Sequence, residues 1–139
     1  MDKVLGLAAI GFAAVFIAVG MAYGQSPADI ARTYEVAARQ EAPHFDGFSA
    51  QRGEQLFQST HGREWSCASC HTQNPRQPGT HAKTGQRIAP LAPAANGERF
   101  TSLDKAEKWF RRNCNDVVGR TCTAREKGDV LAYLMLVKP

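Results

Sequence analysis

The segment Cys67-Ala68-Ser69-Cys70-His71 carries the most specific chemistry in this sequence. Two thiols separated by two residues and followed at once by an imidazole form the C-x-x-C-H signal for covalent attachment of haem c. The thiols add across the two vinyl groups of the macrocycle, and the neighbouring imidazole then binds the iron. We therefore predict that Cys67 and Cys70 are the thioether residues and that His71 is the proximal iron ligand.

The same cysteines admit a zinc interpretation. Four thiolates, from Cys67, Cys70, Cys114 and Cys122, could hold one zinc ion. This interpretation gives His71 no role, and it fits poorly with an oxidising compartment. Haem is therefore the favoured cofactor.

The N-terminus predicts export. Residues 4–23 form an almost wholly apolar run, and Ala22-Tyr23-Gly24 offers small residues at the two positions that a signal peptidase recognises. We predict a signal peptide over residues 1–24 and one monohaem domain over residues 25–139. A run of about 20 apolar residues can also span a bilayer, so a retained N-terminal anchor is the alternative. In both cases the expected location of the domain is the periplasm.

The charge of the chain is mildly positive. Its 139 residues include 17 Lys and Arg against 13 Asp and Glu, which gives a formal net charge of +4. This balance suits an acidic redox partner. No basic stripe with interleaved aromatic residues is present, so we expect no nucleic-acid partner. Membrane contact is expected only if the N-terminal segment is retained.

Two cysteines remain outside the haem motif, Cys114 and Cys122, with seven residues between them. An oxidising compartment favours a disulfide over two free thiols. Closing so short a loop would stabilise the fold by about 2.5 kcal/mol on the chain-entropy estimate.

The pattern of apolar residues and caps predicts an all-α fold with about four helices and little or no strand. Ser26 with Asp29, and Thr123 with Glu126, form capping boxes that begin the first and last helices. Gly53 lies inside the second helix and indicates a close crossing with the last one, which carries Tyr133. This arrangement resembles a class I cytochrome c. The expected helices run from Ser26 to near Pro43, from Ser49 to Thr60, from Thr101 or Ser102 to Asn113, and from Thr123 to the C-terminus.

Two further segments have expected positions. Residues 72–97 are rich in Pro, Gly, Asn and Thr, and we expect them to wrap the haem edge with the apolar residues 88–93 turned inward. In the last helix the residues expected to face the core are Val130, Leu131, Leu134, Leu136 and Val137.

The sixth iron ligand is not evident from the residues alone. Carriers of this class use a methionine, but Met1 and Met21 lie in the predicted signal, and Met135 is interpreted as a core gap-filler. The sixth position is then open, water-filled or held by another residue. His44 and His61 are interpreted as loop residues, and Asn113 is unremarkable on pattern. His81 could reach the iron from its long loop.

The sequence resembles the Sphaeroides haem protein family and its close relative cytochrome c double-prime over nearly all of the predicted mature chain. The resemblance is carried by the haem motif, by residues 83–93, by Arg99-Phe100-Thr101, by Asn113-Cys114-Asn115 and by Cys122. It implies one covalent haem c and a disulfide between Cys114 and Cys122. It also implies that the residue before the first disulfide cysteine is the distal ligand, which is asparagine in the first family and histidine in the second. Asn113 is therefore the expected distal ligand of ferric iron.

The resemblance implies two overlapping functions. The first is electron transfer with other redox proteins, such as multihaem or membrane cytochromes, in which case a carrier is favoured over an enzyme. The second is binding or slow conversion of O2, NO or CO at a site that Asn113 vacates on reduction, where its amide NH2 could donate to the gas. A low-spin carrier with His81 on the iron is a third hypothesis. We also expect Arg99 to pair with a haem propionate and Trp109 to pack on the haem. A peroxidase is disfavoured because no histidine accompanies Arg111 and Arg112.

Overall fold

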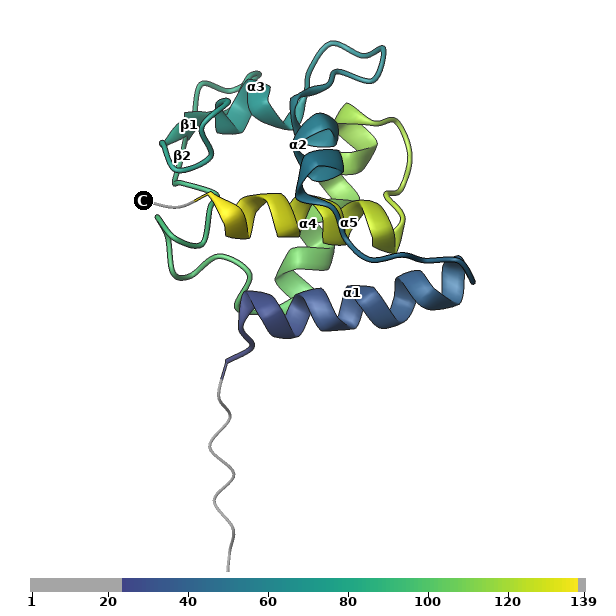
Figure 1. Ribbon diagram of the computed structural model, residues 1–139. Coiled ribbons are helices and arrows are strands. Elements are labelled where there is room, and N and C mark those ends of the chain that lie inside the picture. Colours follow the sequence, from purple (N-terminus) through teal and green to yellow (C-terminus); the bar gives the residue numbers. More distant parts are fainter. Residues whose placement is uncertain (1–23, 138–139) are drawn as a thin grey trace, which may run out of the picture.

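The computed structural model describes residues 24–137, and its elements are mostly helical, as predicted (Figure 1). The signal peptide or anchor predicted over residues 1–24 lies almost wholly outside this part. Within the described residues, no helix is both long and apolar enough to cross a membrane. The elements in chain order are α1 (Pro27–Glu41), α2 (Ala50–Gln58), α3 (Cys67–His71), β1 (Gly79–Thr80), β2 (Arg87–Ile88), α4 (Leu103–Val117) and α5 (Ala124–Leu136).

Two short features were not among the expected elements. The haem motif itself forms the five-residue helix α3, and residues 72–97 contain a small antiparallel ladder. In this ladder Gly79 pairs with Ile88 and Thr80 pairs with Arg87. The ladder folds the long segment back onto the haem motif.

Helices α2 and α5 cross at Gly53, as the sequence predicted. A Cβ atom at Gly53 would overlap the carbonyl oxygen of Asp129 on α5, so only glycine permits this approach. The carboxylate of Asp129, which is 4% exposed, accepts a hydrogen bond from the Ser49 N–H at 2.7 Å. It also accepts one from Arg52 Nε at 2.8 Å. This buried carboxylate therefore joins the start of α2 to the middle of α5.

The core lies on both sides of α5. Figure 1 shows α1 along one side of this helix and α2 with α3 on the other. On the α1 side, Ile30 and Tyr34 pack with Leu131. On the α2 side the buried residues are Phe57, Val130, Tyr133 and Leu134, and Cys67 and Ala68 of the haem motif pack against them. The haem motif is thus supported by the α2–α5 crossing.

Helix α4 is longer than predicted and ends at Val117 instead of Asn113. It continues because Cys114 and Val117 are buried. It stops where Gly119 takes a left-handed conformation with a φ of 80°, and the N–H groups of Val118 and Gly119 both donate to the Cys114 carbonyl. Asn113 therefore lies within the helix, with one more turn after it.

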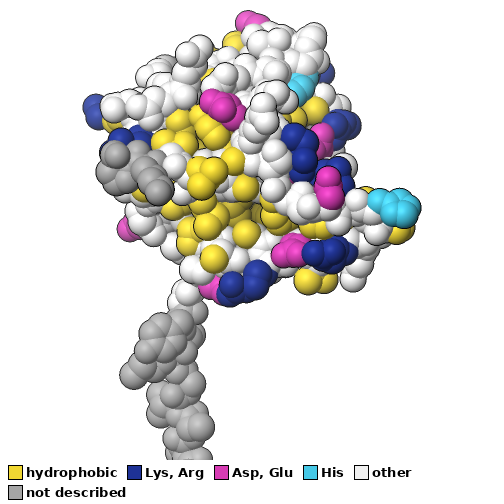
Figure 2. All heavy atoms as spheres, in the orientation of Figure 1, with side chains coloured by type: hydrophobic (Ala, Val, Ile, Leu, Met, Phe, Trp, Pro, Cys, Tyr) yellow, Lys and Arg dark blue, Asp and Glu magenta, His cyan; other side chains and the backbone are white. Residues whose placement is uncertain are grey.

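Two expectations for the end of α5 were wrong. Leu136 was expected in the core but is 63% exposed, and Met135, interpreted as a gap-filler, is 41% exposed. Leu136 lies two residues after the buried Leu134, which places it on the opposite face of the helix. In the view of Figure 2, hydrophobic side chains gather in the middle of the face, and charged side chains lie toward its margins.

Candidate haem site

Helix α3 presents the proximal residues on a single short helix. The Ser66 hydroxyl accepts a hydrogen bond from the Ser69 N–H at 3.2 Å, and the Ser69 hydroxyl accepts one from the Ser66 N–H at 3.0 Å. This capping box fixes where the helix begins. Cys67 and Cys70 are consequently one turn apart, with both thiols free of a disulfide, and His71 follows at the helix end.

The ladder segment packs directly on this motif. A Cβ atom at Gly79 would overlap the carbonyl oxygen of Cys70, and the Ala82 N–H donates to Cys70 Sγ at 3.3 Å. His81 belongs to this same turn, where its ring Nδ1 accepts a hydrogen bond from the Thr84 N–H at 3.3 Å. Because this turn packs on the proximal motif, the geometry gives no support to His81 as the ligand opposite His71.

The surroundings of His71 keep its imidazole neutral. Burial, together with the nearby positive charge of Arg99, lowers the pKa of His71 to about 4. Its ring lies 6.4 Å from that of Phe57, measured between centroids, and Phe57 in turn lies 5.5 Å from Tyr133. A neutral imidazole has a nitrogen lone pair to offer a metal at neutral pH.

Burial also keeps the Cys67 sulfur protonated, since it raises the pKa of this thiol to about 11. The motif thus offers a thiol rather than a thiolate at this position.

Arg99 holds the apolar segment 88–93 beside the motif. Its Nε donates to the Pro90 carbonyl at 2.9 Å, and one terminal nitrogen donates to the Ala89 carbonyl at 2.8 Å. Within the segment, Ala92 is fully buried. The role of Arg99 as a propionate partner stays a prediction, and its hydrogen bonds give it a structural role as well.

The predicted distal residue, Asn113, is partly buried on α4. Trp109 lies one turn before it and Asp116 about one turn after it, so the three share one helix flank. Trp109 is 49% exposed, and the Arg112 guanidinium lies 5.9 Å from the centroid of its ring. Packing of Trp109 on the haem stays a prediction.

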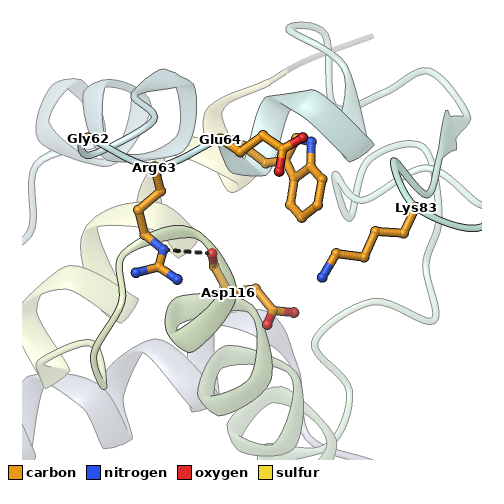
Figure 3. Close-up of a pocket in the computed structure, with 6 residues that line it drawn as sticks. Gly62, Arg63, Glu64, Lys83 and Asp116 are labelled. Atoms are coloured by element: carbon orange, nitrogen blue, oxygen red, sulfur yellow. Dashed lines mark hydrogen bonds between the residues drawn. The ribbon is translucent and has the colours of Figure 1, made fainter.

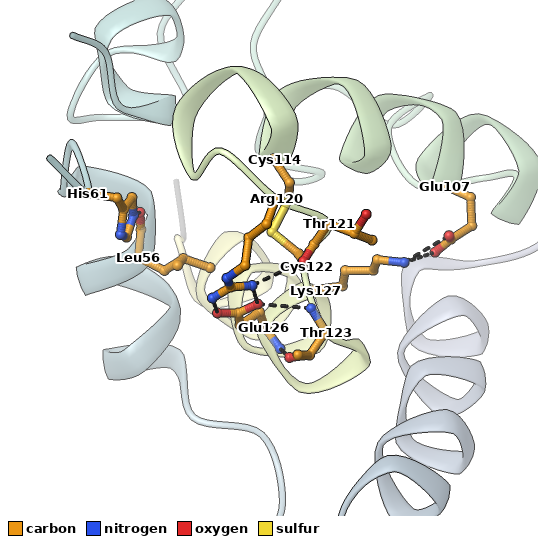
Figure 4. Close-up of a disulfide and its surroundings, with 10 residues drawn as sticks. All are labelled: Leu56, His61, Glu107, Cys114, Arg120, Thr121, Cys122, Thr123, Glu126 and Lys127. Atoms are coloured by element: carbon orange, nitrogen blue, oxygen red, sulfur yellow. Dashed lines mark hydrogen bonds and ion pairs between the residues drawn. A yellow bond between two sulfur atoms is a disulfide. The ribbon is translucent and has the colours of Figure 1, made fainter. Parts of the chain in front are cut away.

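A disulfide joins Cys114 to Cys122, with 5.8 Å between their Cα atoms, as expected (Figure 4). Both residues are buried, and the bond links α4 to the start of α5. It uses two of the four thiols that the zinc interpretation requires, so that interpretation fails. Over residues 24–137, no group of three or more His, Cys, Asp or Glu side chains could hold a metal ion.

A cleft of about 560 Å³ opens between the chain around the haem motif and α4 (Figure 3). None of the predicted haem residues Cys67, Cys70, His71 and Asn113 lines it. Asp116 and Lys83 point into it from different segments. The lining residues are Gly62, Arg63, Glu64, Trp65, Lys83 and Asp116.

Two residues of the cleft, Arg63 and Asp116, were not expected near the site from the sequence. Asp116 could have been found from its spacing of three residues from Asn113, had the helix been extended to Gly119. Arg63 has no such signal, since only the fold brings it to α4, whereas Lys83 belongs to the segment 72–97 that was expected at the haem edge.

Comparison with known proteins decides the family. A family model described as a domain of unknown function (DUF1924) matches residues 43–134. The chain is 43% identical to the cytochrome c-type protein SHP of Cereibacter sphaeroides, over 87% of this chain and 92% of that one. It is 36% identical to cytochrome c'' of Methylophilus methylotrophus, over 89% of each chain. The chain belongs to the SHP and cytochrome c'' family.

Solved structures of the same relatives share this fold. Oxidised SHP, described as an oxygen-binding cytochrome c, matches with a TM-score of 0.70 over 80% of this chain and 96% of that one. Oxidised cytochrome c'' from M. methylotrophus also matches with a TM-score of 0.70, over 79% of this chain and 93% of that one. The class I cytochrome c-like fold predicted from the sequence is confirmed.

The residues present fit one covalently bound haem c, which is the cofactor of this cytochrome family. Two free thiols and a neutral imidazole on α3 would supply the attachment and one iron ligand. The cleft is lined by Asp116 of α4 and by residues 62–65, which precede this donor set in the chain. The protein is therefore a monohaem cytochrome.

Proposed function

We propose that this protein is a periplasmic electron-transfer cytochrome whose distal ligand, Asn113, leaves the iron on reduction. The haem, when bound, supplies one-electron redox chemistry and, in the ferrous state, an affinity for diatomic gases. The observation that carries the proposal is the placement of Asn113 on α4, directly before the buried Cys114 of the disulfide. The resemblance of the sequence to SHP, which is 43% identical, supports this choice of ligand.

The chemistry of the Asn113 side chain supports a ligand that can be released. Its carboxamide oxygen is a neutral and weak donor, which suits the greater charge of ferric iron better than that of ferrous iron. The same amide carries an NH2 group, which can donate a hydrogen bond once the oxygen is free. Asn113 can therefore serve as an iron ligand in one redox state and as a hydrogen-bond donor in the other.

A second function, gas binding, follows from the same residue. The relative SHP is described as oxygen-binding in its solved structure, and it is 43% identical to this chain. We infer that O2, NO or CO can enter the position that Asn113 leaves, with slow conversion of the gas as the enzymatic alternative. Fast CO binding by the ferrous protein would support this inference, whereas indifference to CO would favour a low-spin carrier.

The partner is inferred from charge. The formal net charge of +4 suits an exported redox protein with an acidic surface, such as a multihaem or membrane cytochrome. We expect electron exchange with such a partner to slow as ionic strength rises, because salt screens this attraction. A rate that is independent of salt would contradict this.

The direct test is Asn113→Ala, with absorption spectra recorded in both redox states. We expect a changed ferric spectrum and a nearly unchanged ferrous one, because the ligand is bound only in the ferric state. Asn115→Ala is the matched control, since Asn115 lies two residues further along α4 and is exposed. Unaltered spectra in both states of Asn113→Ala would show that Asn113 is not the ligand.

A further inference from the structure

The loop between α2 and α3 has an uncommon backbone conformation. His61 and Gly62 both have left-handed backbones, with φ of 54° and 74°. The His61 ring bonds the Leu56 carbonyl at 2.9 Å, at the end of α2, and the Arg63 N–H donates to the Thr60 carbonyl at 2.9 Å. A non-glycine residue at positive φ is uncommon and requires support from its surroundings. These hydrogen bonds hold the turn in place and so fix the position of Arg63 in the loop.

Arg63 reaches the last turn of α4. Its Nε donates to the Asp116 carbonyl at 3.1 Å, as Figure 3 shows. A Cβ atom at Gly119 would lie only 2.8 Å from Arg63 Nη1, so this glycine also leaves room for the guanidinium. The last turn of α4 contains no basic residue of its own. Arg63 therefore supplies the positive charge that is favourable at a helix C-terminus. It also satisfies one of the carbonyl groups that the end of α4 leaves without a partner in the helix.

We propose that Arg63 is a positioning residue that holds the Asn113 oxygen in reach of ferric iron. This inference rests on the proposed role of Asn113. Arg63 precedes Cys67 by four residues, and its acceptor Asp116 follows Asn113 by three. The hydrogen bond thus links the chain that carries the haem attachment to the helix that carries the distal ligand. The disulfide ties the same helix to α5, so the two tethers hold α4 from different sides.

The physical reason is the weakness of the amide ligand. A weak donor is bound in only part of the ferric molecules if its helix is free to move, because each competing position lowers the bound fraction. A net hydrogen bond of ordinary strength shifts such an equilibrium by about 2- to 10-fold. The loss of the Arg63 bond should therefore change ferric ligation measurably without unfolding the domain.

The experiment compares Arg63→Gln and Arg63→Lys with Arg111→Gln in the haem-loaded protein. Arg111 is exposed on α4, closer in sequence to Asn113, and no side-chain hydrogen bond or ion pair of Arg111 occurs within the described part of the chain. All three variants are titrated with cyanide in the ferric state, where cyanide must displace Asn113. We expect Arg63→Gln to bind cyanide about 2- to 10-fold more tightly than the wild type. Arg111→Gln should stay near wild type, and Arg63→Lys should lie between, because lysine restores a charge and one donor.

The reduction potential separates positioning from simple loss of charge. Removing a positive charge favours ferric iron and lowers the potential, which is the only effect expected for Arg111→Gln. Loosening a ligand that binds only ferric iron disfavours the ferric state and raises the potential. We therefore expect the potential of Arg63→Gln to lie above that of Arg111→Gln. Equal potentials and equal cyanide affinities in these two variants would overturn the proposal.

A double variant distinguishes this failure from failure of the proposed ligand. In Asn113→Ala, the further change Arg63→Gln should leave cyanide affinity unaltered, because Arg63 acts only through Asn113. Tighter binding in the double variant than in Asn113→Ala would contradict the proposed route. Amide hydrogen exchange in the last turn of α4 should rise in Arg63→Gln and in the double variant alike. If Asn113→Ala itself has a wild-type ferric spectrum, the ligand assignment fails, whatever Arg63 does.

Discussion

The two sides of the haem site are built in different ways. On the proximal side, Cys67, Cys70 and His71 lie on one five-residue helix, and the capping box of that helix spans only Ser66 to Ser69. On the proposed distal side, the helix that carries Asn113 is tied from outside, by the disulfide to Cys122 and by Arg63, which lies 53 residues from its acceptor. A permanent attachment can be specified locally. A weak and releasable ligand, as we propose Asn113 to be, would need its position supplied by tertiary contacts.

The largest effect is expected from the proximal side. Replacing both Cys67 and Cys70 by serine should abolish covalent haem, because no thiol remains to form a thioether. Haem staining of a denaturing gel measures this. The matched distal change, Cys114→Ser with Cys122→Ser, should keep its covalent haem. Loss of the haem in both double variants would contradict the separation of the two sides.

The packing that supports the proximal helix is tested by Gly53→Ala. The added methyl group would overlap the Asp129 carbonyl, so α2 and α5 must separate, at a cost of about 3 kcal/mol in the free energy of unfolding. Guanidinium unfolding followed by circular dichroism measures the change. Gly97→Ala is the control, because a Cβ there meets nothing within 4 Å, and its effect should stay within about 0.5 kcal/mol.

The distal tether to α5 is tested by the Cys114→Ser and Cys122→Ser pair in the same unfolding assay. Removing a link between residues eight apart should lower the free energy of unfolding by about 2.5 kcal/mol. The ferric spectrum should also shift toward that of Asn113→Ala, because the end of α4 loses one of its two tethers. An unchanged ferric spectrum would mean that the disulfide serves stability alone.

The smallest effect is expected from Glu126→Gln, beside the disulfide (Figure 4). The Arg120 guanidinium bonds this carboxylate, and the Thr123 N–H donates to it at 2.8 Å, which lowers the pKa of Glu126 below its usual 4.5. A lowered folded-state pKa gives stability that is present above the unfolded pKa and is lost as the pH falls through the folded one. The variant should therefore cost about 1 kcal/mol at pH 7 and almost nothing in strong acid. Equal costs at both pH values, from unfolding curves, would contradict this.

Local signals predicted the parts of the fold that depend on neighbours in sequence. The capping boxes at Ser26 and Thr123 and the crossing at Gly53 all agree with the structure. The end of α4 was misplaced, because Asn113 resembles a helix stop and the true stop at Gly119 lies beyond the buried Val117. The exposure of Leu136 was missed because an apolar residue at the end of an apolar helix does not reveal which face is covered.

The amino-acid sequence by itself predicted the proximal chemistry, since a thioether pair and its imidazole need only a fixed spacing along one helical turn. The tertiary structure alone decided how the distal helix is held, through a loop arginine and a cleft whose walls come from three segments. The physical reason is distance along the chain. A contact between residues 53 positions apart leaves no periodic pattern in the sequence. It forms only once the intervening helices have packed.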